Sequence, residues 1–133
     1  MRKVTFLFTL AVIALSAASV SAQYGGKAEP NRVRFAKGKS SATLTGSLKG
    51  DEEYEFVFGA KKGQTVYITN SDSNNFAYRV FVPENEDVNY DSTDLAVPTL
   101  EFVVPETGDY MLTVRRNTDS KVAKRFSITL AIE

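Results

Sequence analysis

The sequence predicts an all-β fold, a single antiparallel β-sandwich of jelly-roll or Greek-key type with about eight strands. First, apolar and polar side chains alternate through most of the chain after residue 32, and a period of two is typical of half-buried strands. Second, clusters of Gly, Pro, Asn, Asp and Ser separate the alternating runs, and none of these runs has a convincing helical period. Strands at this spacing form two packed sheets.

The strands follow from the alternation, taken in chain order. Early strands are expected near Val33–Phe35 and at Ala42–Leu48. The apolar faces of the next six strands are Tyr54, Phe56 and Phe58; Val66 and Ile68; Phe76, Tyr78, Val80 and Val82; Leu100, Phe102 and Val104; Tyr110, Leu112 and Val114; and Phe126, Ile128, Leu130 and Ile132. The longest connection is expected from Pro83 to Pro98, as a polar, acidic loop.

Residues 1–22 have the pattern of a secretory signal peptide. Basic residues at positions 2 and 3 precede an apolar run over 4–20, and Val20-Ser21-Ala22 supplies a small-x-small cleavage site. The apolar run is short for a membrane span and has no stop-transfer charges behind it. We expect cleavage after residue 22, a flexible lead over 23–32 and the sandwich domain over 33–133. The expected location is the periplasm or beyond, with no membrane anchor.

Composition excludes several classes of protein. The chain has neither cysteine nor histidine, so disulfides, lipoprotein anchors, thiolate zinc sites and Ser-His-Asp triads are excluded. Residues 80–114 contain no Lys or Arg, and a basic block follows them. The acidic residues are Glu84, Glu86, Asp87, Asp91, Asp94, Glu101, Glu106 and Asp109, and the basic block comprises Arg115, Arg116, Lys121, Lys124 and Arg125. This division argues against nucleic-acid binding. It suits a partner that is cationic near the contact, or an ordinary solvated surface.

Four motifs resemble those of one known family. They are K-G-K-S-S-A at 37–42, Y-E-F at 54–56, A-K-K-G-Q at 60–64 and T-G-D-Y at 107–110. Together they resemble the periplasmic inhibitors of goose-type (g-type) lysozyme, over about residues 33–132. The last two motifs also occur in the wider class of pre-peptidase C-terminal domains. The sequence departs from the family at Thr107, where Ser is more frequent, and over residues 74–98.

The resemblance implies an exported protein that binds goose-type lysozyme and occludes its active site. It implies a non-enzymatic protein, a monomer or weak homo-oligomer, without a cofactor or metal. Its inhibitory loop is expected at Thr107, Gly108, Asp109 and Tyr110. Thr107 would offer a hydroxyl to the catalytic carboxyl, and Gly108 would permit a tight turn and close approach. Asp109 would meet a cationic rim, and Tyr110 would add a rigid contact.

Structural alternatives accompany these assignments. Tyr110 alternates with Leu112 and Val114, so it is equally compatible with the core, and Gly-x-Tyr at this point resembles a tyrosine corner. The resemblance places a basic loop beside the inhibitory loop. That loop would add flanking contacts from Arg115, Arg116 and Asn117, with Arg116 pairing to enzyme carboxylates. The alternative for this loop is a solvated turn.

Two peripheral features complete the expected contact surface. Tyr90 and Asp91, in the acidic loop, are expected as outer contacts. Residues 87–91 begin like a calcium loop, but Ser92 and Pro98 stand where Gly and Glu are needed, so no metal site is expected. The A-K-K-G-Q turn is interpreted as structural.

Three other functions remain open from the sequence. The chain could be a β-sandwich module that binds cell-wall polysaccharide or a secreted protein, although it has no Trp for a sugar platform. It could inhibit a different type of lysozyme, because related inhibitors use similar small-Gly-Tyr loops. A small enzyme using paired carboxylates is the third alternative.

Overall fold

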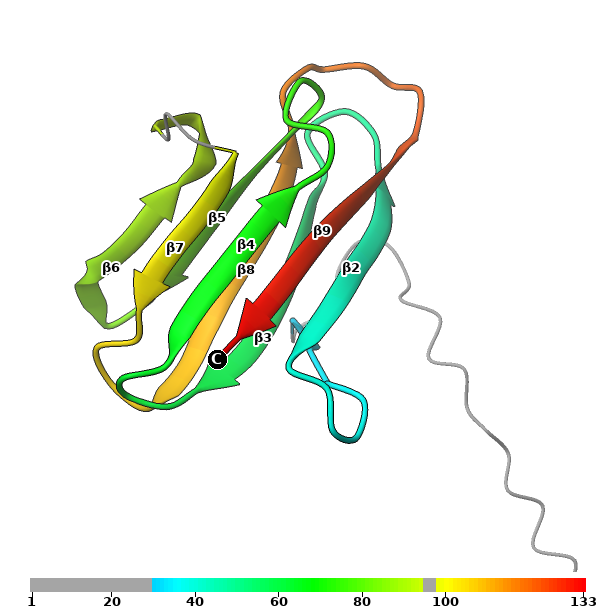
Figure 1. The fold of residues 1–133 in the computed structure, drawn as a ribbon. Coiled ribbons are helices and arrows are strands. Elements are labelled where there is room, and N and C mark those ends of the chain that lie inside the picture. The colour runs from blue at the N-terminus through cyan, green and yellow to red at the C-terminus, as the bar shows by residue number, and fades with distance from the viewer. Residues whose placement is uncertain (1–29, 95–97) are drawn as a thin grey trace, which may run out of the picture.

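Two β-sheets pack face to face in the computed structural model, which describes residues 30–94 and 98–133 (Figure 1). The predicted signal peptide and most of the predicted lead lie outside the described residues. One sheet has the order β1 (Asn31–Arg32), β3 (Glu53–Ala60), β8 (Gly108–Arg116), β5 (Phe76–Val82), β6 (Asn85–Asp91). The other has the order β2 (Ser41–Leu48), β9 (Lys124–Ile132), β4 (Thr65–Asn70), β7 (Thr99–Val103). A short 3-10 turn, η1, covers Ser92–Asp94.

The predicted β-sandwich is confirmed, and the alternating apolar faces meet between the sheets. Phe126 on β9 lies at the centre of an aromatic cluster, with ring centroids 5.4 Å from Tyr54, 6.2 Å from Phe56 and 5.8 Å from Phe76. Gly46 on β2 is required by this packing, because a Cβ there would lie 2.8 Å from the Phe126 ring. Within the described residues, nothing helical has the length and hydropathy that a membrane span requires.

The central strand β8 connects two opposite ends of the sandwich. Its register with β3 places Gly108 beside Ala60 and Arg115 beside Glu53. We call the first end the Thr107 end, made of residues 60–65 and 104–109. We call the second the Arg116 end, made of residues 49–52, 71–75 and 116–123. At a rise of about 3.3 Å per residue, the two ends of β8 are roughly 25 Å apart.

Three details of the predicted strand plan are wrong. The first strand is Asn31–Arg32 rather than Val33–Phe35, so two residues of the predicted lead are paired, in parallel, with β3. The expected Pro83–Pro98 loop contains β6, which makes nine strands among the described residues. The sequence does not predict β6, because this strand lies at the edge of its sheet and only Val88 is buried. It therefore shows no regular alternation of apolar residues. Finally, the strand expected through Tyr110, Leu112 and Val114 begins earlier, at Gly108.

Candidate functional site

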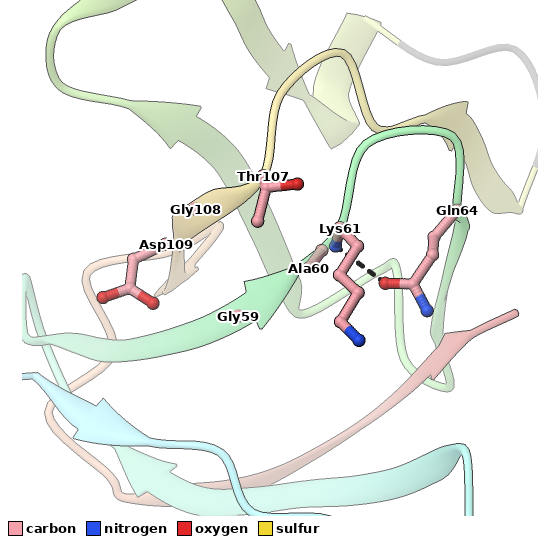
Figure 2. Close-up of a pocket in the computed structure, with 7 residues that line it drawn as sticks. All are labelled: Gly59, Ala60, Lys61, Gln64, Thr107, Gly108 and Asp109. Carbon is pink, nitrogen blue, oxygen red and sulfur yellow. Dashed lines mark hydrogen bonds between the residues drawn. The ribbon is translucent and has the colours of Figure 1, made fainter.

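A shallow pocket of about 330 Å³ lies at the Thr107 end, between the end of β3 and the start of β8 (Figure 2). It is lined by Gly59, Ala60, Lys61, Gln64, Thr107, Gly108 and Asp109. Three of the four residues of the expected inhibitory loop therefore share one pocket. The A-K-K-G-Q turn, interpreted from the sequence as structural, forms its opposite wall.

Hydrogen bonds join the two walls of the pocket. The backbone N–H of Lys62 donates to Thr107 Oγ1 at 2.9 Å, across 45 positions of sequence. The backbone N–H of Gly63 donates to the Val104 carbonyl at 2.9 Å. Gly63 has a φ of 89°, a left-handed conformation that favours glycine. The loop that carries Thr107 is therefore held against the 60–64 turn at two points.

Gln64 fixes the turn itself. Its side-chain Oε1 accepts the backbone N–H of Lys61 at 2.7 Å, and its carbonyl accepts the backbone N–H of Val104 at 2.8 Å (Figure 2). The Lys61 side chain is exposed and extends along the pocket between Asp109 and Gln64 (Figure 2). The backbone of Lys61 is thus anchored while its ammonium group faces solvent.

Tyr110 belongs to the core, so its expected role as a direct contact is wrong. The residue is 2% exposed, and its ring stacks on Phe58 at 5.6 Å between centroids. Its hydroxyl donates a 2.6 Å hydrogen bond to the backbone carbonyl of Glu106. This bond back to the preceding loop is the tyrosine-corner arrangement of the structural alternative. Tyr110 therefore stabilises the loop that carries Thr107 from the core side.

Gly108 is exposed at the first position of β8. A Cβ placed there would meet no atom within 4 Å, and its φ is not among the positive values. The expected tight turn at this glycine is therefore wrong, because β8 is already extended there. The open space above Gly108 is compatible with close approach of another molecule.

Asp109 lies on β8 opposite Gly59, and its carboxylate is already paired. Arg32 on β1 reaches across Gly59 and donates to both carboxylate oxygens, at 3.0 and 3.2 Å. Hydrogen bonding to Arg32, together with its charge, holds the pKa of Asp109 below its usual range. Sequence reasoning missed Arg32, because only the parallel pairing of β1 with β3 brings it to this end.

The basic residues expected beside the loop lie at the Arg116 end, so that placement is wrong. Arg116 Nη1 donates to the Leu48 and Val122 carbonyls, at 3.3 and 2.6 Å. The Asn117 side chain donates to the carbonyls of Ser73 and Asn74. These bonds hold three loops together at the end opposite the pocket. The reason for the difference is β8, which runs the length of the sandwich between Thr107 and Asn117.

Tyr90 and Asp91 are also placed away from the pocket. The Tyr90 ring packs on Phe102, with centroids 4.9 Å apart, and is only partly exposed. Asp91 pairs with Arg115, whose Nη2 lies 3.1 Å from each carboxylate oxygen. Desolvation acts to raise the pKa of Asp91, but hydrogen bonds from Thr93 and Arg115 outweigh it and leave that pKa lowered. Within the described residues, no three carboxylates gather to hold a metal ion.

No family model matches the chain, but the related proteins and structures described next share one description. The inhibitor of g-type lysozyme from Escherichia coli K12 is 32% identical over 110 residues, which cover 76% of this chain and 79% of that protein. Crystal structures of PliG, a periplasmic lysozyme inhibitor of g-type lysozyme, superpose well. The Aeromonas hydrophila protein has a TM-score of 0.65 at 26% identity, covering 78% of this chain and 96% of its own. The Salmonella Typhimurium protein has a TM-score of 0.63 at 28% identity, covering 79% and 99%.

Proposed function

This chain belongs to the family of g-type lysozyme inhibitors, and we propose that it binds a g-type lysozyme in the periplasm and blocks the active-site cleft. The relatives support the enzyme class and the location, since they are described as periplasmic inhibitors of g-type lysozyme. The protein performs no chemistry of its own. By occupying the cleft, it protects cell-wall peptidoglycan from cleavage.

The Thr107 end is the part of the molecule that enters the cleft. A lysozyme cleft is shaped to hold a sugar chain and carries a carboxylic acid at the scissile bond. A blocking loop must therefore be narrow and must offer polar hydrogens to a carboxyl group. Thr107 and Gly108 are both exposed and small, and Thr107 offers the hydrogen of its hydroxyl.

This proposal rests on the hydrogen bonding of the Thr107 hydroxyl. Its oxygen accepts the Lys62 N–H at 2.9 Å, so the side chain is fixed in one orientation. A hydroxyl has one hydrogen to donate besides its acceptor sites, and that hydrogen is left for an enzyme carboxylate. A hydrogen bond to an ionised carboxylate is about twice as strong as one between neutral groups.

Rigidity at this end lowers the cost of binding. The Lys62–Thr107 and Tyr110–Glu106 hydrogen bonds hold the loop on both sides before any partner arrives. A loop that is ordered in the free protein loses little conformational entropy on binding. The two bonds therefore support affinity without contributing a contact themselves.

Titration of lysozyme activity tests the proposal. The purified protein is added to goose-, chicken- and invertebrate-type lysozymes acting on a cell-wall suspension. Stoichiometric inhibition of the goose type supports the proposed function. Inhibition of another type alone overturns the target assignment. Retention on insoluble peptidoglycan without inhibition of any lysozyme overturns the function and indicates a polysaccharide-binding module.

A further inference from the structure

The pocket at the Thr107 end contains one uncompensated charge. Its charged lining residues are Lys61 and Asp109. The Asp109 carboxylate is neutralised by the two hydrogen bonds from Arg32. The described residues form three ion pairs, Arg32–Asp109, Arg115–Asp91 and Lys124–Asp72, and none of these involves Lys61. The pocket therefore presents a single unpaired cation to an incoming partner.

From this arrangement we infer that Lys61 is a further determinant of affinity, because its ammonium group binds a carboxylate in the cleft of the target enzyme. The inference rests on the proposed function and adds to it the charged contact that the sequence assigned to Arg116. Arg116 donates to backbone carbonyls at the opposite end, whereas Lys61 lines the same pocket as Thr107.

The geometry suits this role. The Lys61 backbone is anchored by Gln64 at 2.7 Å, so the flexible stem starts from a fixed point. Figure 2 shows the side chain running along the pocket, with its amino group directed away from the turn. Lys61 therefore offers its ammonium group at the same pocket that Thr107 lines, where a carboxylate of the enzyme can accept its hydrogen bonds.

Other carboxylates at this end do not cancel the charge in the pocket. Glu106 is exposed on the loop, and Glu133 exchanges backbone hydrogen bonds with Thr65. Neither residue lines the pocket. When the cleft closes over the pocket and excludes water, the pair formed by Lys61 becomes desolvated. Charged pairs at such positions change dissociation, whereas charges on the rim change mainly the association rate.

A matched pair of variants tests the inference. Lys61→Met and Lys62→Met each remove one ammonium from the same exposed turn and keep the backbone donors, but Lys62 does not line the pocket. Association and dissociation rates with a g-type lysozyme are measured for both variants and the wild type. The measurements are made at about 50 and at about 300 mM NaCl, because the higher salt concentration shortens the range over which surface charges interact.

We expect Lys61→Met to weaken binding by about 10- to 100-fold, mostly through faster dissociation at both salt concentrations, and Lys61→Arg to restore part of the loss. Lys62→Met should change affinity by less than about threefold, and this change should come from the association rate at the lower salt concentration. Equal effects of the two methionine variants, or none from Lys61→Met, overturn the inference while wild-type inhibition still supports the proposed function. No inhibition by the wild type overturns the proposed function itself.

Discussion

The backbone N–H of Lys62 donates a 2.9 Å hydrogen bond to the side-chain oxygen of Thr107, and this bond joins the two walls of the pocket. It gives the threonine a role in the fold as well as at the surface. The bond uses one acceptor site of the hydroxyl and leaves its hydrogen free. Substitutions at position 107 can therefore separate the two roles.

Replacement of Thr107 by valine keeps the shape of the side chain and removes the hydroxyl. We expect inhibition to weaken by about 10- to 100-fold, because the donor to the enzyme carboxylate is lost. Stability should fall by only about 1 kcal/mol, since the Lys62 N–H left behind lies on an exposed turn and can bond to water. Inhibition constants and urea unfolding provide the two readouts.

Thr107→Ser is the control for that experiment. Serine keeps a hydroxyl at the same position, so inhibition should stay within about threefold of the wild type. If serine weakens inhibition and valine does not, the methyl group rather than the hydroxyl makes the contact.

Replacement of Tyr110 by phenylalanine removes the 2.6 Å hydrogen bond to the Glu106 carbonyl and keeps the stacked ring. We expect a loss of stability of about 1–2 kcal/mol, as for a buried hydrogen bond. Inhibition should weaken modestly, because the loop carrying Thr107 becomes less ordered before binding. Thermal unfolding and inhibition constants measure the two effects. A large loss of inhibition with unchanged stability would indicate that the hydroxyl contacts the enzyme directly.

The Arg32–Asp109 pair predicts a specific dependence of stability on pH. Asp109 has a lowered pKa in the folded state, chiefly because Arg32 hydrogen-bonds to its charged form. A carboxyl of this kind stabilises the fold above its unfolded pKa of about 3.9. That contribution disappears as the pH falls through the lower, folded-state pKa.

Arg32→Gln isolates the pair from the other carboxylates with lowered pKa values, Asp72 and Asp91. Urea unfolding of the wild type and the variant should differ at pH 7, and the difference should shrink as the pH falls below about 4. Both pair members are largely exposed, so the difference at pH 7 should be small. A difference that persists unchanged in strong acid would assign the role of Arg32 to packing instead of charge.

The Arg116 end is expected to matter for folding and not for inhibition. Arg116→Ala removes the donor to the Leu48 and Val122 carbonyls, and the stability should fall by about 1–3 kcal/mol. Inhibition measured well below the melting temperature should stay at the wild-type value. If a folded Arg116 variant fails to inhibit, the enzyme binds the opposite end of the sandwich.

Much of the fold could be predicted from the sequence because apolar alternation reports burial directly. Tyr54, Phe56 and Phe58, for example, point into the core as their spacing indicates. The alternation failed at β6, where Val88 alone is buried, and at Arg32, whose position depends on a parallel pairing between distant segments. The alternation of apolar residues along one segment does not indicate which distant segment pairs with it.

The site was predicted in part for a similar reason. Thr107, Gly108 and Asp109 share a pocket, but Lys61 joins them only through the register of β3 with β8. Arg32 reaches Asp109 only through the pairing of β1 with β3. The separation of Arg116 from Thr107 could be predicted from the sequence, since the expected strand through Tyr110, Leu112 and Val114 lies between them and nine residues of extended chain span up to roughly 30 Å. The family resemblance suggested proximity where strand length indicated separation.

Bulky substitutions at each end of the molecule distinguish which end enters the cleft. We expect the fold to accommodate Gly108→Trp, because a Cβ at this exposed position would meet no atom within 4 Å. Lys121→Trp adds the same bulk to the exposed loop at the Arg116 end. We expect Gly108→Trp to keep the wild-type melting temperature and to lose inhibition by about 100-fold or more through steric exclusion, while Lys121→Trp inhibits normally. Full inhibition by Gly108→Trp, or its loss in Lys121→Trp alone, would show that the Thr107 end does not enter the cleft.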